Sequence, residues 1–339
     1  MKVLVTGSKG FIAGYLIKEL LDQGYKVIGI DNFAKYGNIK KSYDKHPNYQ
    51  FVYGDVKKSR VLAKHIYDCD HFIALAASVG GLTYFHTFAY DLLMENELIT
   101  INAFNTALNA FRNGKLKKIT VISSSMVFEN ATEFPTPEGH ERLCYPPSST
   151  YGFQKLATEY FAQGAWEQYK LPFTILRPFN ACGIGESRAI CDKEIYSGNI
   201  KLAMSHVIPD LCQKVIKGQN PLHIFGQGNQ IRHYTYGGDI AKAIVISLNN
   251  KNALNQDFNI STNRSTSVIE LAKLINLKIN GTSKIDIIND DSYKYDVHKR
   301  IPDITKTHKL LGFRADTLLE NALDEIIPWV KKQIELGKM

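Results

Sequence analysis

The sequence contains no uninterrupted apolar run approaching the ~18 residues that a membrane-spanning helix requires. No membrane is therefore expected among its partners. The N-terminus passes directly into a short apolar run and a glycine turn, which leaves no room for the charged and apolar segments of a secretory signal.

Cysteine is scarce, with five residues in 339, and no two of them form a C-x-x-C pair. This excludes a small disulfide-stapled fold and gives no motif for zinc or thiol redox chemistry. Internal repeats and low-complexity tracts are also missing, and the ordinary globular composition excludes a collagen and a disordered tail protein. The scattered cysteines predict reduced thiols in a cytoplasmic protein without a metal.

What the chain does have is an excess of basic residues, 41 Lys and Arg against 33 Asp and Glu, for a net charge of +8. Such a balance attracts nucleic acid, an acidic membrane or small phosphorylated ligands. Because no run of clustered basic residues with interleaved aromatics is present, nucleic acid is not an expected partner. Of these three classes of ligand, small phosphorylated molecules remain as the expected one.

Apolar runs alternate with helical patterns along the first half of the chain. The expected strands are 2–7, 25–31, 50–55, 71–77, 117–125 and 173–180, and the expected helices are 11–24, 88–113 and a segment starting near 151. Near-continuous apolar strands separated by helices are typical of a parallel sheet covered on both faces. The predicted fold is therefore α/β, a Rossmann-type doubly wound parallel sheet.

The second half loses this regular alternation after Pro178. Helices are expected near 203–217 and 239–249, a strand at 257–261, and a largely helical portion from Val268. We predict a cofactor-binding domain of residues 1–178, rejoined by about 234–262. A smaller, interleaved substrate-binding lobe comprises about 179–233 and 263–339.

A glycine turn follows the first strand and opens the first helix. Gly7 permits the tight turn, and Gly10 allows the backbone to approach a pyrophosphate. The helix N-terminus then offers unpaired N–H groups to phosphate oxygens. Asp31 ends the second strand, where a carboxylate can accept hydrogen bonds from an adenosine ribose and repel a 2′-phosphate, which favours NAD over NADP. Asp55 ends the third strand and is placed to accept from the adenine amino group.

Tyr151 and Lys155 stand one helical turn apart, and a serine cluster ends the strand at 117–125. A tyrosine hydroxyl ionises near pH ~10, so its use as a base near neutrality needs a neighbouring cation. Lys155 can supply that charge. A hydroxyl of the Ser123–Ser125 cluster lies at the carboxyl end of its strand, where α/β sheets bind ligands.

These motifs in this order resemble the extended short-chain dehydrogenase/reductase family, in particular its NAD-dependent nucleotide-sugar epimerases and dehydratases. ALAAS after the fourth strand and RPFN after the sixth belong to the same pattern. The resemblance implies an NAD cofactor, a nucleoside-diphosphate-sugar substrate and a homodimer built on the two helices that flank the serine strand.

The resemblance also implies roles for individual residues. The catalytic set is Ser124, Tyr151 and Lys155. The residues that hold NAD are Gly7, Gly10, Phe11, Ile12, Asp31, Asn32, Asp55, Val56, Leu75, Ala76, Ala77, Asn96, Tyr151, Lys155 and Phe179. The residues that bind the substrate are Ser124, Ser125, Tyr151, Asn180, Arg232 and Arg300, of which the two arginines face the diphosphate.

Two positions after the catalytic serine bear on the reaction. Family dehydratases carry an Asp-Glu pair where this chain has Ser125 and Met126, and 3,5-epimerases carry a Cys at the position of Met126. Neither residue present can act as an acid or base near neutrality. The expected activity is therefore a nucleotide-sugar 4-epimerase. A 4-ketoreductase and a 4,6-dehydratase remain alternatives within the family. From another class, the alternative is a noncatalytic NAD-sensing or binding protein.

Overall fold

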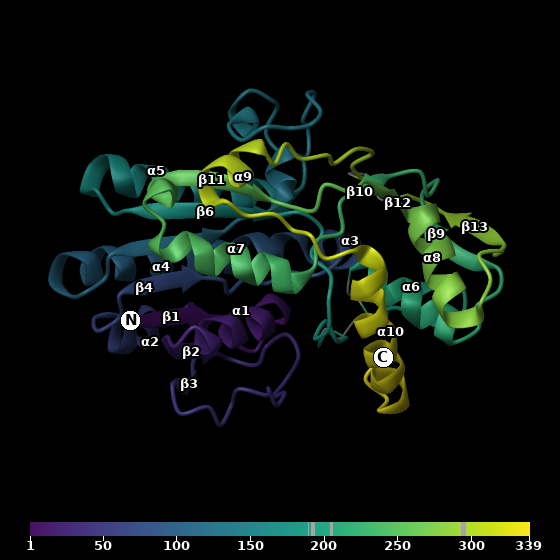
Figure 1. Ribbon diagram of the computed structural model, residues 1–339, viewed down its shortest axis with the longest axis horizontal. Helices are drawn as coiled ribbons and strands as arrows, with labels where there is room; N and C mark the ends of the chain where they lie inside the picture. The colour runs from purple at the N-terminus through teal and green to yellow at the C-terminus, as the bar shows by residue number, and fades with distance from the viewer. Residues whose placement is uncertain (189, 191–193, 204–205, 293–295) are drawn as a thin grey trace.

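The computed structural model describes residues 1–188, 190, 194–203, 206–292 and 296–339. Its centre is a seven-stranded sheet in the order β11-β6-β5-β4-β1-β2-β3, and all six strand pairs are parallel (Figure 1). The strands are β1 (Lys2–Thr6), β2 (Lys26–Asp31), β3 (Tyr49–Tyr53), β4 (His71–Ala74), β5 (Lys118–Ile122), β6 (Phe173–Pro178) and β11 (Gln256–Ile260). The predicted doubly wound α/β fold is confirmed.

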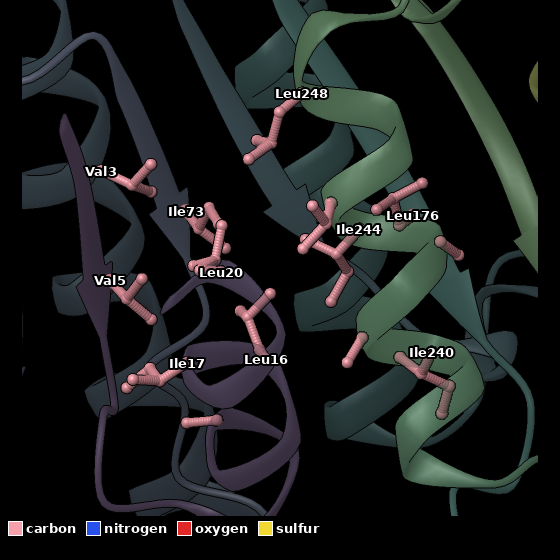
Figure 2. Close-up of a cluster of buried hydrophobic side chains, with 14 of the residues drawn as sticks. Val3, Val5, Leu16, Ile17, Leu20, Ile73, Leu176, Ile240, Ile244 and Leu248 are labelled. Atoms are coloured by element: carbon pink, nitrogen blue, oxygen red, sulfur yellow. The ribbon is translucent and has the colours of Figure 1, made fainter. Parts of the chain in front are cut away.

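Helices cover both faces of this sheet. One face carries α1 (Phe11–Asp22) and α7 (Gly237–Asn249), and the other carries α2 (Ser59–Ile66), α4 (Ala89–Asn113) and α5 (Thr150–Tyr169). In β1, Val3 and Val5 pack with α1 and α7, whereas Leu4 between them joins the opposite core (Figure 2). Successive side chains of a strand point to opposite faces, so a strand buried on both sides must be apolar throughout.

The direction of strand order reverses between β1 and β4, which lie side by side in the middle of the sheet. In such sheets the loops at the carboxyl ends of these two strands diverge to opposite faces and leave a crevice. Here those loops are the glycine turn after β1 and the segment from Leu75 after β4. The topology thus places the predicted cofactor residues in one crevice.

The smaller lobe packs three helices around its own apolar core. These are α6 (Val207–Ile216), α8 (Val268–Asn280) and α10 (Leu319–Glu335). Strands β9 (Leu222–Phe225) and β13 (Ile287–Asp290) pair in parallel, and β10 (Ile231–Arg232) pairs with β12 (Thr266–Ser267). The strand β13 interrupts a portion that the sequence predicts as largely helical.

The remaining short elements lie in connections. They are α3 (Leu82–Thr87), η1 (Ser125–Phe128), η2 (His140–Arg142), β7 (Tyr196–Ser197), β8 (Ile200–Lys201), η3 (Lys251–Ala253) and α9 (Thr305–Leu311). Among the helices of the described part of the chain, none combines the length and apolarity needed to cross a membrane.

The two units interleave, as the sequence predicts, because α7 and β11 return to the large sheet. One part of the segment 263–339 also returns to it. Helix α9 contacts β11, and Leu311, Phe313 and Ala315 join the core under α1 and α7. These side chains are apolar and cover the outer edge of the sheet, so the C-terminal segment serves both units. The domain boundaries themselves stay a prediction.

Candidate active site

A cleft of about 570 Å³ lies at the carboxyl ends of the central strands and extends to the smaller lobe. All six predicted substrate residues line it. Of the predicted cofactor residues, the ones that line it are Gly7, Gly10, Phe11, Ile12, Asp31, Asn32, Asp55, Val56, Leu75, Ala76, Ala77, Tyr151 and Lys155. The fold therefore brings residues from both ends of the chain to one site.

The glycine turn has the geometry that a bound pyrophosphate needs. Gly7 has a φ of +70°, and a Cβ there would lie 2.9 Å from the Cα of Ala76. The N–H of Gly10 donates to the carbonyl of Gly7 at 2.9 Å, which closes the turn. No side chain caps the start of α1, so its first N–H groups can bind an anion. These observations fit a dinucleotide.

Asp31 is fixed at the end of β2 by the backbone. Its Oδ2 accepts from the N–H of Lys9 at 2.9 Å and its Oδ1 accepts from the N–H of Phe33 at 2.7 Å. A carboxylate has about four acceptor positions, so both oxygens can still bind ribose hydroxyls. Asp55 accepts from the N–H of Lys57 at 2.9 Å and faces the same cleft.

Asn96 and Phe179 lie behind the wall of the cleft. The Asn96 amide accepts from the N–H of Ser78 at 2.7 Å and donates to its carbonyl at 2.9 Å. Phe179 is fully buried, with its ring centre 6.3 Å from that of Phe128. Both side chains thus pack behind the residues that line the cleft, and a direct contact of either side chain with NAD remains a prediction.

The catalytic candidates meet where β5 ends beside α5. Ser149 caps α5 by accepting from the N–H of Gly152 at 3.0 Å, which sets the helix start just before Tyr151. The Ser124 hydroxyl accepts from the N–H of Met126 at 3.2 Å, and its interaction with Tyr151 lowers the pKa of the phenol. Lys155 lies one turn further along, with Nζ 5.9 Å from the centre of the Tyr151 ring and 3.0 Å from the carbonyl oxygen of Ile122.

Burial sets the electrostatics of this set. It raises the pKa of Tyr151, while the hydrogen bond from Ser124 and the charge of Arg300 act in the opposite direction. Burial also lowers the pKa of Lys155 to about 8, against the attraction of Glu159. Phenolate formation therefore depends on the surrounding positive charge, because burial disfavours the charged form of the phenol.

A buried ionic network supports the catalytic set from below. Arg177 in β6 donates to both carboxylate oxygens of Glu159, at 2.8 and 2.7 Å, and contacts Asp257 at 2.7 Å. Glu159 also accepts from the Ser123 hydroxyl at 2.5 Å. No motif in the sequence predicts this network, although the arginine inside the apolar strand FTILRP indicates a buried partner, because a buried charge must be paired.

The two predicted phosphate-binding arginines come together from distant segments. Arg232 in β10 donates to the Asp296 carboxylate at 2.8 Å, whereas Arg300 places Nη2 2.8 Å from the Met126 sulfur. Burial and the neighbouring charge of Arg232 lower the pKa of Arg300 to about 9. Arg300 therefore reaches the residue two positions after Ser124, at the end of the cleft that holds the serine cluster.

Sequence reasoning assigned no role to several other cleft residues. Lys35 lines the cleft from the loop after β2, Tyr84 and Phe85 line it from the short helix α3, and Glu186 and His206 line it from the lobe side. None of these residues belongs to a spacing pattern in the sequence.

A parallel sheet with a phosphate-binding turn, an acidic β2 end and a Ser-Tyr-Lys set defines a dinucleotide-dependent enzyme of the short-chain dehydrogenase/reductase type. The model of the family described as "NAD dependent epimerase/dehydratase family" matches residues 3–261. The chain belongs to this family, and NAD is therefore its cofactor.

Individual relatives are similar over nearly the whole chain. A Methanocaldococcus jannaschii protein named "Putative UDP-glucose 4-epimerase" is 30% identical over 97% of this chain and 98% of its own. The structure of a Thermotoga maritima UDP-glucose 4-epimerase with UDP-glucose has a TM-score of 0.81 at 26% sequence identity. The match covers 98% of this chain and 100% of that one. The structure of a Bacillus cereus UDP-glucuronic acid 4-epimerase with UDP-glucuronic acid and NAD has a TM-score of 0.81 at 27% sequence identity. The match covers 98% of this chain and 99% of that one.

Proposed function

We propose that this chain is a nucleotide-sugar 4-epimerase. The observation that carries the proposal is the Ser124, Tyr151 and Lys155 set, in which the two positions after the serine hold neither an acid nor a base. Met126 and Ser125 are buried, at 4% and 2% exposure, and neither can exchange a proton near neutrality. The relatives named above act on nucleotide sugars at C4, which supports the same class of substrate here.

In this reaction Tyr151 accepts the proton of the sugar 4-hydroxyl. Ser124 holds the same oxygen through its hydroxyl, and Lys155 stabilises the phenolate by its charge. NAD, when bound, supplies the chemistry of accepting and returning a hydride. The 4-keto sugar turns over within the cleft, and Tyr151 returns its proton once the opposite face is reduced. No atom is gained or lost by the sugar overall.

A 4-ketoreductase would use the same three residues but must exchange its cofactor in every cycle. The contacts around the cleft support retention instead. The N–H of Ile190 donates to the carbonyl of Lys35 at 2.9 Å, joining the loop after β2 to the loop after β6. Tyr15 of α1 accepts from the N–H of Ile184 at 2.7 Å on the same side. Both contacts attach the segment after β6 to the cofactor-binding side of the cleft.

We further propose a homodimer that forms through α4 and α5. The exposed apolar side chains of these helices are Tyr90, Met94, Leu98, Ile101, Phe153, Tyr160, Phe161 and Tyr169. Exposed apolar side chains gathered on two neighbouring helices are typical of a subunit interface. Light scattering tests it: a monomer of 38.2 kDa would contradict the proposal. A cytoplasmic location stays a prediction from the cysteine content.

The activity is tested with a panel of UDP-, GDP-, CDP- and dTDP-sugars in deuterated water, followed by mass spectrometry and separation of the epimers. A 4-epimerase converts one sugar into its C4 epimer without incorporating deuterium on carbon, because the hydride moves directly. Deuterium at C3 or C5 would contradict the assignment. Loss of one water would instead identify a dehydratase, and consumption of added NADH would identify a reductase.

A further inference from the structure

Glu159 is a buried carboxylate in α5 that the mechanism above does not use. It lies one helical turn after Lys155 and two turns after Tyr151, so the three side chains share one face of the helix. Glu159 is 0% exposed and Lys155 is 7% exposed. Glutamate is almost never fully buried unless it is paired, so the partners of this carboxylate indicate what it does.

The same face of α5 contacts the end of β5. The Nζ of Lys155 donates to the carbonyl of Ile122 at 3.0 Å, and the hydroxyl of the next residue, Ser123, donates to Oε1 of Glu159 at 2.5 Å. The residue after that is the catalytic serine, which interacts with the catalytic tyrosine. Three consecutive residues of the strand end thus contact three helix residues that are one turn apart.

An arginine from the neighbouring strand fixes the carboxylate. Arg177 of β6 donates to both oxygens of Glu159, from Nε at 2.8 Å and from Nη2 at 2.7 Å. Together with the Ser123 hydroxyl, these donors hold Glu159 in one orientation. Hydrogen bonds from a guanidinium also favour the charged form of a carboxylate.

The positive charge of Arg177 is shared among several acids. Arg177 also contacts Asp257 of β11 at 2.7 Å and Glu141 of η2 at 3.1 Å, and Asp257 pairs in turn with Lys306 of α9 at 2.5 Å. Burial raises the pKa of Glu141. With Glu141 protonated the cluster is neutral, and with Glu141 ionised it carries one negative charge. Arg177 therefore does not make the surroundings of Glu159 positive.

Lys155 needs a nearby negative charge to stay protonated. Burial lowers the pKa of Lys155 to about 8, and the attraction of Glu159 acts against burial. The hydrogen-bond partner of its Nζ, the carbonyl of Ile122, is neutral. The other charge that acts on the catalytic tyrosine is Arg300, which is itself a cation and favours the phenolate. Glu159 is thus the acid that favours the charged form of Lys155.

We propose that Glu159 is a positioning residue that acts through Lys155, keeping this side chain charged beside the catalytic tyrosine. Arg177 and Ser123 hold the carboxylate in place. Glu159 itself is not among the described residues that line the cleft, so it acts without touching substrate or cofactor. This inference rests on the proposed function, because it takes Tyr151 as the base that a charged lysine supports.

The first test measures the titration of Lys155 and needs no turnover. The NAD-loaded protein carries lysine labelled with ¹³C at Cε, its NMR signals are followed against pH, and Lys155→Met identifies the signal of Lys155. Glu159→Gln removes the negative charge but keeps the shape of the side chain. We expect it to lower the titration midpoint of Lys155 by about one pH unit, because a nearby opposite charge favours the charged form.

The second test measures turnover of the nucleotide sugar against pH. At low pH Lys155 is protonated in both proteins, so Glu159→Gln should change turnover little. The loss should grow to about tenfold near pH ~9, because a midpoint one unit lower reduces the charged fraction of Lys155 by that factor. Glu159→Asp keeps the charge on a shorter side chain, so any loss that it causes should be the same at every pH.

Glu141→Gln is the matched control. Glu141 is 5% exposed and contacts the same guanidinium, but it is not one of the groups that shift the pKa of Lys155. This variant should leave the Lys155 midpoint and the pH dependence of turnover unchanged. Melting temperatures are measured for every variant. Should Glu159→Gln fail to fold, Arg177→Met is added to remove the unpaired guanidinium, and the double variant should show the same lowered midpoint.

Three results would overturn the proposal. An unchanged Lys155 midpoint in Glu159→Gln would show that the carboxylate does not keep the lysine charged. A turnover loss that is equal at every pH, with a lower melting temperature, would leave Glu159 a purely structural role. An equal shift of the midpoint in Glu141→Gln would assign the effect to the cluster as a whole. A lowered midpoint in a protein that converts no nucleotide sugar would support the action of Glu159 on Lys155 and contradict the proposed function alone.

Discussion

Replacing Lys118 with methionine should make the protein more stable near neutral pH. Lys118 begins β5 and is 1% exposed, and its Nζ donates to the carbonyl of Ser247 at 2.6 Å. Burial lowers the pKa of Lys118 from 10.5 to about 8. At 1.36 kcal/mol for each pKa unit, keeping this ammonium protonated in the folded state costs about 3 kcal/mol. Methionine fills a similar volume without that cost.

The substitution also removes a favourable contact. Ser247 lies in the last turn of α7, so no N–H of a following helical turn donates to its carbonyl. Lys118→Met therefore leaves this carbonyl without its partner, at a cost of about 1 kcal/mol. The net gain in free energy of unfolding is therefore about 2 kcal/mol near pH ~7. The unfolded chain binds this proton more tightly than the folded one. The cost of burying the Lys118 ammonium is therefore complete at pH values below its pKa in the folded protein, and it disappears as the pH rises toward its pKa in the unfolded chain. The stability gained by Lys118→Met should accordingly fall to near zero at about pH 9.5.

The measurement is thermal unfolding of the NAD-loaded protein at both pH values. Lys117→Met is the matched control, because the neighbouring Lys117 side chain is 61% exposed and pairs with Asp70 on the surface. It should change the melting temperature little at either pH. A lower melting temperature for Lys118→Met near pH ~7, or a gain that does not shrink at higher pH, would refute the reasoning.

Three further predictions concern the site. Tyr151→Phe should lower turnover by about 10²–10⁴-fold while the purified protein keeps its NAD, measured by epimer separation and by NAD release; unchanged turnover would exclude Tyr151 as the base. Gly7→Ala should weaken NAD binding about fivefold or more, because the left-handed backbone of Gly7 and the nearby Ala76 Cα oppose a methyl group. The control is Gly24→Ala, which should keep NAD, because Gly24 has a similar φ of +79° but open space around it. Asp31→Ser should weaken NAD binding about tenfold and reduce discrimination against NADP, measured by cofactor titration; an unchanged NAD to NADP ratio would argue against the ribose contact.

The parts of the fold that could be predicted are those where one physical requirement dominates. A strand covered on both faces is mostly apolar, and β5 and β6, buried along their whole lengths, show this in sequence. Their buried charges, Lys118 and Arg177, each have hydrogen-bond partners in the folded chain. The glycine turn could also be predicted from the sequence, because Gly7 adopts a backbone conformation with positive φ that other residues avoid. Helical spacing puts Tyr151 and Lys155 on one face, and the serine cluster at the end of the preceding strand, together with the resemblance to the family, marked that face as a site.

What the sequence could not give depends on the conformation of loops and on distant pairings. Arg300 lies beside Met126, 174 residues away along the chain, and no periodicity predicts this contact. Asn96 was assigned to the cofactor, but its amide is used by the backbone of Ser78. Glu186 and the backbone N–H of His206 likewise come together from two segments of irregular backbone. Each of these contacts needs the folded chain to be recognised.

The return of α9 to the large sheet has a consequence for synthesis on the ribosome. The core under α1 and α7 is covered by Leu311, Phe313 and Ala315, and Arg300 also comes from this late part of the chain. A nascent chain that ends after β11 has every strand of the sheet but leaves this apolar surface open to solvent. We therefore expect truncation near residue 261 to give an aggregating product, with the cleft completed only when synthesis is almost finished.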